Sequence, residues 1–195
     1  MESDNDRRSF LSFAIFGLGA IFSAVIGVPI VCYALDPRHR KGADGGLKPV
    51  EGIKLDELAL DRPEQGVIRD VRVDGWTLYP NDVIGRVWVV QVGARPANVE
   101  NLQQAQKDAY LLVFTTICPH LGCSVNLDSA GTGFACPCHS ATFDKKGDRA
   151  TAANPALRGM DTLEWDFDET DPDRNRIKVK YENFVTSIRE KKTIG

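Results

Sequence analysis

Two cysteine–histidine motifs stand out in the sequence: C-P-H-L-G-C at residues 118–123 and C-P-C-H at residues 136–139. Each motif brings one cysteine and one histidine so close along the chain that a single tight turn can direct both side chains to the same point. The Gly-containing residues 129–133 predict the turn of a hairpin that returns the second motif to face the first. The candidate metal ligands are Cys118, His120, Cys136 and His139.

Two thiolates and two imidazoles are the ligand set of one type of [2Fe–2S] cluster, in which one iron takes cysteine and the other histidine. The same four residues suit a structural zinc site, and the cysteines alone suit a disulfide-bonded secreted domain. Each motif also carries a further cysteine, Cys123 or Cys138, and this favours the iron–sulfur interpretation over zinc. The whole chain has three histidines, and a disulfide framework gives no reason for two of them to lie inside the motifs.

The chain resembles Rieske iron–sulfur proteins in both of their cluster-binding boxes, here C-P-H-L-G-C at residues 118–123 and C-P-C-H-S-A-T-F-D at residues 136–144. The resemblance is to the disulfide-containing members found in cytochrome bc complexes. It extends to N-P-A-L-R at residues 154–158, which lies where that family has a proline-rich loop covering the cluster. A single amino-terminal membrane anchor is a further shared feature.

The resemblance implies a role for every cysteine and histidine of the motifs. In a Rieske [2Fe–2S] cluster, Cys118 and Cys136 would be the ligands of the buried iron, and His120 and His139 would be the ligands of the outer iron. The spare cysteines, Cys123 and Cys138, would form a disulfide. Because a metal acidifies the groups bound to it, either histidine can accept a hydrogen bond from quinol and then take up a proton together with the electron.

The resemblance also implies residues that shield or tune the cluster, namely Leu121, Ser140, Ala141, Phe143 and Pro155. Rieske proteins of high potential usually have a serine and a tyrosine where this chain has Ala141 and Phe143, and a glycine at position 140. Hydroxyl hydrogen bonds to cluster sulfurs stabilise the reduced state. Their absence predicts a low-potential centre, suited to menaquinol rather than ubiquinol, unless Ser140 supplies one such bond. Leu121 would also contact bound quinone.

An uncharged run from Phe10 to Leu35 exceeds the ~20 residues that span a bilayer, and it predicts an uncleaved transmembrane anchor at residues 10–35. Residues 1–9 contain an Arg-Arg pair in a context that resembles a twin-arginine export signal. Lys and Arg are more numerous just after the run than before it, which alone favours the opposite orientation. Because disulfides persist outside the cytosol, we expect a single-pass protein of the inner (cytoplasmic) membrane with its head on the periplasmic side.

The Gly-rich residues 36–49 predict a flexible linker, which the resemblance implies is a hinge. Residues 50–195 form one further domain. Segments rich in β-branched residues predict its strands, at 67–73, 86–92, 110–116, 163–167 and 177–181. Other expected features are turns at 74–75 and 82–85, a short helix at 97–109 and solvated turns at 166–169 and 171–174, with Trp76, Trp88 and Trp165 in the core. The fold class is therefore all-β, an antiparallel Rieske-type domain with the cluster-binding loops at one tip, plus one N-terminal transmembrane helix.

A net charge of −3 gives no reason to expect nucleic-acid binding. The resemblance implies the Rieske electron-transfer subunit of a membrane quinol–cytochrome c oxidoreductase, a cytochrome bc-type complex. It would take one electron from quinol with coupled proton release and pass it to a cytochrome. Its partners would be cytochrome b, a c-type cytochrome and quinol within the membrane. The alternative is the Rieske small subunit of another exported oxidoreductase such as arsenite oxidase. A soluble ferredoxin that feeds an oxygenase conflicts with the anchor.

Overall fold

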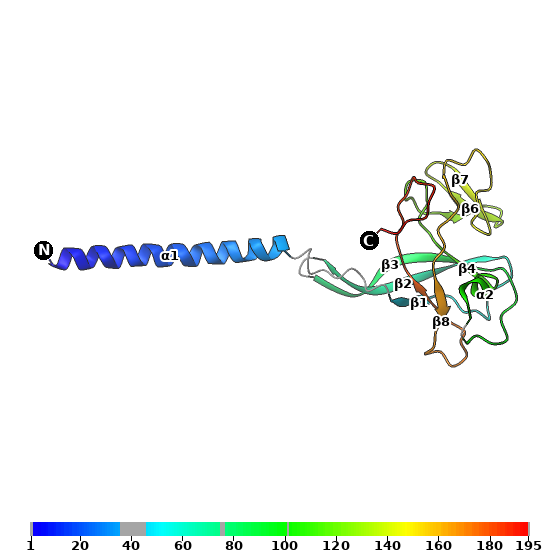
Figure 1. The fold of residues 1–195 in the computed structure, drawn as a ribbon, viewed down its shortest axis with the longest axis horizontal. Coiled ribbons are helices and arrows are strands. Elements are labelled where there is room, and N and C mark those ends of the chain that lie inside the picture. The colour runs from blue at the N-terminus through cyan, green and yellow to red at the C-terminus, as the bar shows by residue number, and fades with distance from the viewer. Residues whose placement is uncertain (1, 36–45, 75–76, 101, 195) are drawn as a thin grey trace. The chain divides into compact units, whose positions relative to one another are not determined.

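The computed structural model describes residues 2–35, 46–74, 77–100 and 102–194. Contacts divide the chain into two units, Met1–Asp44 and Gly45–Gly195, which are described separately. Most of the predicted linker, Gly75 of the predicted turn at 74–75 and the core position expected for Trp76 lie outside the described residues. Figure 1 shows the helix of the first unit and the β structure of the second.

The first unit contains one long helix, α1 (Glu2–Leu35). Its residues Asp6–Leu35 have a mean hydropathy of 2.4 over the most apolar window, and none of that window is buried within the molecule. At 1.5 Å per residue these 30 residues extend about 45 Å, more than the ~30 Å hydrocarbon core of a bilayer. Large side chains such as Phe13, Phe16 and Ile30 are exposed along the helix. The predicted apolar helix that can cross a membrane is therefore confirmed.

The second unit is built on a six-stranded antiparallel sheet with the strand order β4-β3-β2-β1-β9-β8. Its strands are β1 (Leu47–Glu51), β2 (Pro63–Asp74), β3 (Thr77–Gln91), β4 (Leu111–Thr115), β8 (Trp165–Phe167) and β9 (Ile177–Lys180). A smaller sheet has the order β5-β6-β7 and consists of β5 (Asn126–Leu127), β6 (Gly133–Cys136) and β7 (Ala141–Asp144). Figure 1 shows β6 and β7 standing apart from the larger sheet. Every strand pairing in the two sheets is antiparallel, which confirms the predicted all-β architecture.

The described residues form two hydrophobic cores, and the smaller core takes in Trp88 and Val90 of β3 and Phe114 of β4 as well as residues of the smaller sheet. The larger core surrounds Trp165, whose indole N–H donates to the Leu111 carbonyl over 3.1 Å. The smaller core surrounds Trp88, whose indole N–H donates to the Val125 carbonyl over 3.0 Å. Both tryptophans are buried as predicted. The smaller core also takes in Cys118, so one candidate ligand is part of the packed interior.

The predicted turn at residues 82–85 is wrong, because these residues continue β3 opposite β2. The pairing register changes there: Ile68 faces Gly85 and Arg69 faces Val83, so Ile84 is an extra residue on one strand. An extra residue of this kind is a β-bulge, which bends a strand without ending it. Asp82 and Gly85, which resemble a turn signal in the sequence, therefore lie on either side of a β-bulge.

Two other boundaries differ from the prediction. The structure assigns residues 47–49 of the predicted linker to β1, because Leu47 and Pro49 pair with Lys180 and Lys178 of β9. The helix predicted at 97–109 is shorter, α2 (Gln104–Asp108). Upstream of it, the Asn98 side chain accepts a hydrogen bond from the Glu100 amide over 2.9 Å, and such local bonds compete with helix formation.

The predicted solvated turn at 166–169 is also wrong. Residues 166 and 167 belong to β8, and Asp168 is 3% exposed. Its carboxylate accepts a hydrogen bond from the Thr170 hydroxyl over 2.7 Å and forms an ion pair with Lys178 at 3.0 Å. Burial raises the pKa of this carboxyl, but the bonds from Thr170 and Lys178 outweigh burial and the pKa lies at about 2. Sequence alone does not show this pairing, since Lys178 comes from the next strand.

Candidate metal centre

The first loop, residues 118–123, follows β4 and is closed by its own backbone. The Cys118 amide donates to the Cys123 carbonyl over 2.7 Å, and the Gly122 amide donates to the Cys118 carbonyl over 2.9 Å. Gly122 has a φ of +81°, a left-handed conformation that glycine adopts without steric cost. Just outside the loop, Ile117 and Ser124 form an isolated antiparallel bridge. The motif therefore folds as the compact turn that its spacing predicts.

The second loop, residues 137–140, connects β6 to β7. Cys136 is the last residue of β6 and pairs with Ala141, the first residue of β7, so the loop is a tight hairpin connection. Ser140 has a φ of +57° at the end of this turn. The hairpin that precedes it turns at residues 128–132, where the predicted turn lies. Pairing of β5 and β7 with β6 thus fixes the position of the second loop.

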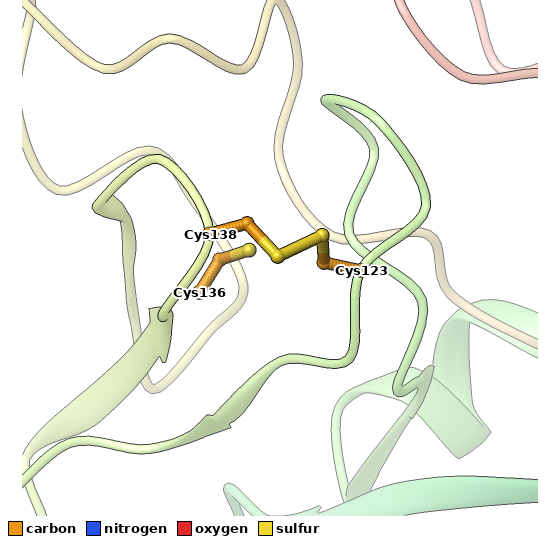
Figure 2. Close-up of side chains that lie close together, drawn as sticks. All are labelled: Cys123, Cys136 and Cys138. Carbon is orange, nitrogen blue, oxygen red and sulfur yellow. A yellow bond between two sulfur atoms is a disulfide. The ribbon is translucent and has the colours of Figure 1, made fainter.

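A disulfide between Cys123 and Cys138 joins the two loops, as predicted, with a Cα–Cα distance of 6.6 Å. Figure 2 shows this bond with the Cys136 side chain beside it. The sulfur atoms of Cys123, Cys136 and Cys138 all lie within 4.8 Å of one another. Because two of these sulfurs are bonded to each other, Cys136 is the member of this group whose thiol is available to a metal.

The two free thiols of the motifs lie together in the interior. Cys118 and Cys136 are 0% and 2% exposed and belong to the smaller hydrophobic core. Burial and the neighbouring Cys136 thiol together raise the pKa of the Cys118 thiol to about 11, although the backbone amides of His120 and Leu121 act to lower it. The two cysteines therefore share one buried, apolar environment. A bound metal would displace the protons, since cysteine ligates as thiolate.

The two histidines form a second pair. The ring centroids of His120 and His139 are 4.9 Å apart, and the rings are nearly perpendicular at 87°. His120 is half-buried and His139 is exposed. The two loops thus carry two thiols in one buried core and two more accessible imidazoles in contact with each other. Among the described residues, no three ligand atoms of these four side chains lie within 4.8 Å of one another.

The residues predicted to shield or tune the centre lie in two groups. Ala141 and Phe143 are 0% and 2% exposed and pack in the same core as the thiols. Ser140 is exposed, Pro155 is half-buried, and Leu121 is 55% exposed beside His120 in sequence. No side-chain hydroxyl donates a hydrogen bond to Cys118 or Cys136 in the part of the chain that the structure describes.

The covering loop, residues 154–158, packs on this core. The buried Asn154 side chain donates to the Thr142 carbonyl of β7 and accepts a 2.9 Å bond from the Ala156 amide. Ala156 is fully buried in the smaller core, which also contains Cys118 and Cys136. The loop is therefore fixed to the strand that follows the second loop.

Sequence reasoning missed the C-terminal residues that contact the first loop. The Ser187 amide donates to the Pro119 carbonyl over 2.9 Å, and the Ser187 hydroxyl donates to the His120 carbonyl over 2.5 Å. Arg158 of the covering loop donates to the carbonyls of Val185 and Ile188. Local sequence around Ser187 carries no motif that could have indicated this role.

The donor set fits a Rieske-type cluster. Two thiols buried in the same core can serve one iron, and two imidazoles in ring contact can serve the other. The disulfide uses the remaining two cysteines of the loops, so neither competes for metal. Structural zinc would accept the same four donors, and comparison with known proteins separates the two possibilities.

The Rieske [2Fe-2S] domain family model matches residues 78–164, which include both loops and the covering loop. The menaquinol:cytochrome c reductase iron–sulfur subunit of Bacillus subtilis (strain 168) is 29% identical over 164 residues, 83% of this chain and 86% of that protein. The cytochrome b6-f complex iron–sulfur subunit of Desmonostoc sp. (strain PCC 7906) is 30% identical over 150 residues, 74% of this chain and 70% of that protein. In the crystal structure of the cyanobacterial plasma membrane Rieske protein PetC3 from Synechocystis PCC 6803, the match covers 50% of this chain and 78% of that one, with 27% identity and a TM-score of 0.34. The family model and the two sequence relatives show that the chain belongs to the Rieske iron–sulfur protein family, whose domain holds a [2Fe–2S] cluster.

Proposed function

We propose that the chain is the Rieske electron-transfer subunit of a membrane quinol–cytochrome c oxidoreductase of the cytochrome bc type. The observation that carries this proposal is the site itself, in which two buried thiols accompany two adjacent imidazoles and one imidazole is exposed. Such a site can exchange an electron with a partner that docks on its accessible side. The relatives support the assignment, since they are named as iron–sulfur subunits of menaquinol:cytochrome c reductase and of the cytochrome b6-f complex.

Each ligand has a distinct part in this proposal. Cys118 and Cys136 would hold one iron of the cluster, and His120 and His139 would hold the other. When bound, the cluster supplies one-electron redox chemistry. His139 presents its ring at the surface, where a nitrogen can accept a hydrogen bond from a quinol hydroxyl and hold the released proton. His120 is the second candidate for this contact, and the neighbouring Leu121 side chain offers apolar surface to the quinone ring.

Menaquinol is the quinol that the tuning residues favour. Hydrogen bonds from hydroxyl groups to cluster sulfurs stabilise the reduced state and raise the potential. Ala141 and Phe143 bring no hydroxyl into the buried surroundings of the thiols. Ser140 is exposed at a φ of +57°, and its hydroxyl has no hydrogen bond to either thiol within the described ranges. This apolar environment favours a cluster of low midpoint potential, and such a cluster suits a low-potential donor such as menaquinol.

Helix α1 anchors the chain in the inner (cytoplasmic) membrane in this proposal, with the Rieske head on the periplasmic side. The length and hydropathy of Asp6–Leu35 support the anchor. The side is argued from the disulfide of the head, since disulfides persist in oxidising compartments, and from the Arg7-Arg8 pair that resembles an export signal. Protease added to spheroplasts should therefore cleave the head without lysis of the cells.

Affinity purification tests the assignment. The tagged full-length chain, purified from its own membranes in mild detergent, should bring with it a b-type and a c-type cytochrome, which haem spectra detect. A menaquinol analogue added to this preparation should reduce the c-type cytochrome. The substitution His139→Ala should abolish this reduction while both cytochromes remain bound, and Ser129→Ala, in the exposed turn between β5 and β6, should not affect it.

Two outcomes would contradict the proposal. One is purification of the chain without cytochromes and with a large exported oxidoreductase subunit, which would support the arsenite-oxidase-like alternative. The other is cytochrome reduction by the menaquinol analogue at the wild-type rate in the His139→Ala preparation.

A further inference from the structure

The end of the chain folds back on itself beside the metal centre. The Val185 amide donates to the Lys192 carbonyl over 2.8 Å, and the Ile194 amide donates to the Asn183 carbonyl over 2.8 Å. Phe184 is buried in the larger core and fixes the start of this turn. The C-terminal segment, drawn in red in Figure 1, is therefore an ordered part of the head up to residue 194.

Ser187 bonds to the backbone of the first loop at two consecutive peptide groups. Its amide donates to the Pro119 carbonyl over 2.9 Å, and its hydroxyl donates to the His120 carbonyl over 2.5 Å. Ser187 has a φ of +61°, which is uncommon for a residue other than glycine and has to be maintained by its surroundings. The serine thus faces the loop with both of its donors in a conformation that the neighbouring structure must support.

Arg158 supplies that support from the covering loop. Its guanidinium donates to the carbonyl of Val185, two residues before Ser187, over 2.8 Å, and to the carbonyl of Ile188, the residue after Ser187, over 2.7 Å. The same guanidinium forms a bidentate pair with Asp161, with both N–O distances at 2.8 Å. The side chains of Arg158 and Asp161 are 9% and 4% exposed. The turn that presents Ser187 is therefore held by a rigid, buried ion pair.

Hydrogen bonds of the first loop divide into internal and external ones. The carbonyls of Cys118 and Cys123 are satisfied by amides of the loop itself. The carbonyls of Pro119 and His120 are satisfied by Ser187. Because a carbonyl fixed by a donor fixes its peptide plane, Ser187 restricts the backbone on both sides of the His120 Cα.

We propose that residues 185–188 form a clamp in which Ser187 is a positioning residue for the His120 imidazole, with Arg158 as its support. This inference rests on the assignment of His120 as a ligand in the proposed function. The clamp also links the first loop to the covering loop, since Arg158 belongs to the latter. Ser187 acts through the backbone and touches neither the imidazole ring nor the thiols in any contact that the structure gives.

The test uses three variants of the full-length chain in detergent, loaded with its cluster. Ser187→Ala removes the hydroxyl and keeps the backbone amide. Ser187→Thr keeps the hydroxyl, but its β-branched side chain is poorly suited to a positive φ and lowers the melting temperature. Ser129→Ala is the matched control, a serine exposed in the turn between β5 and β6. The readouts are the EPR spectrum of the reduced protein, the rate of cluster loss and the melting temperature.

The clamp predicts that the EPR spectrum changes only when the Ser187 hydroxyl is lost, whereas both variants at this position lower the melting temperature. Ser187→Ala should shift the EPR g values and speed cluster loss about fivefold, the factor given by loss of one neutral hydrogen bond, and lower the melting temperature by about 2–4 °C. Ser187→Thr should keep the wild-type spectrum although it melts earlier. Wild-type spectra and loss rates in Ser187→Ala, or a Ser187→Thr spectrum that matches that of Ser187→Ala, would overturn the proposal.

Hydrogen exchange separates failure of the clamp from failure of the proposed function. Amides of residues 118–123 in the Ser187→Ala chain should exchange about fivefold faster than in wild type, and this measurement requires no cytochrome partner and no cluster. Unchanged exchange would overturn the clamp even in a chain that oxidises quinol. Faster exchange in a chain that purifies without cytochromes would support the clamp and contradict only the proposed function.

Discussion

The buried pair of Arg158 and Asp161 allows a quantitative test of how the head is held together. Substitution Arg158→Met removes four hydrogen bonds, two to Asp161 and two to backbone carbonyls of the C-terminal segment. Asp161 would remain 3% exposed as a whole residue without its partner. Removal of one partner from a buried ion pair costs about 3–5 kcal/mol, because the other charge stays buried and uncompensated. For a domain of this size, that loss lowers the melting temperature by about 6–20 °C.

The assay is thermal unfolding of the full-length chain in detergent, followed by near-ultraviolet circular dichroism of the buried tryptophans. Arg149→Met is the matched control, since Arg149 is an exposed arginine whose side chain donates to the carbonyls of Ala152 and Asn154. Its substitution should cost about 1 kcal/mol or less. The double variant Arg158→Met/Asp161→Leu should recover part of the loss, because no buried charge remains. A melting temperature of Arg158→Met equal to that of Arg149→Met would refute the reasoning.

Three further perturbations test other parts of the structure. Replacing Cys123 and Cys138 by alanine together should lower the unfolding free energy by about 3 kcal/mol, the value for a loop of 15 residues, and urea titration checks this against wild type with and without reductant. Phe143→Tyr should raise the midpoint potential by about 60 mV through a new hydroxyl hydrogen bond to a sulfur, since ~59 mV is a tenfold change for one electron; an unchanged potential in a redox titration would contradict the explanation given for the low potential. Because Asp168 has its pKa held at about 2, it stabilises the folded state above pH ~4, and this contribution, on the order of 2 kcal/mol, is lost as the pH falls to ~2. The Asp168→Asn protein should therefore have a lower unfolding free energy at neutral pH than wild type. Its unfolding free energy should also change less between pH ~4 and pH ~2 in acid-unfolding curves, and a pH dependence equal to that of wild type would contradict this.

The sequence predicts the two cysteine–histidine loops well because the information for each loop is local. Spacing of Cys118 and His120 in one motif, and of Cys136 and His139 in the other, places each pair in one turn whatever the rest of the chain does. The prediction of the Cys123–Cys138 disulfide came from the family resemblance, and the structure confirms it. Five strands of the larger sheet are likewise indicated by runs of β-branched residues that pack on a pleated surface, whereas β1 is not predicted.

What the sequence does not show depends on partners far along the chain. Ser187 lies 67 positions from His120, and nothing near it indicates a contact. The bulge at Ile84 resembles a turn because Asp and Gly serve both structures, and only the pairing with β2 decides between them. Asp168 reads as a solvated charge because Lys178, its ion-pair partner, belongs to the adjacent strand. In each case the deciding interaction is tertiary.

An EPR-monitored redox titration of the full-length chain, with iron, sulfide and zinc determined on the same sample, tests the metal centre most directly. We predict a rhombic Rieske-type signal that ascorbate fails to produce and dithionite produces, and that is lost when His139 or Cys136 is replaced by alanine. Zinc in place of iron, with no such signal in the wild-type protein, would contradict the assignment of these loops to a [2Fe–2S] cluster.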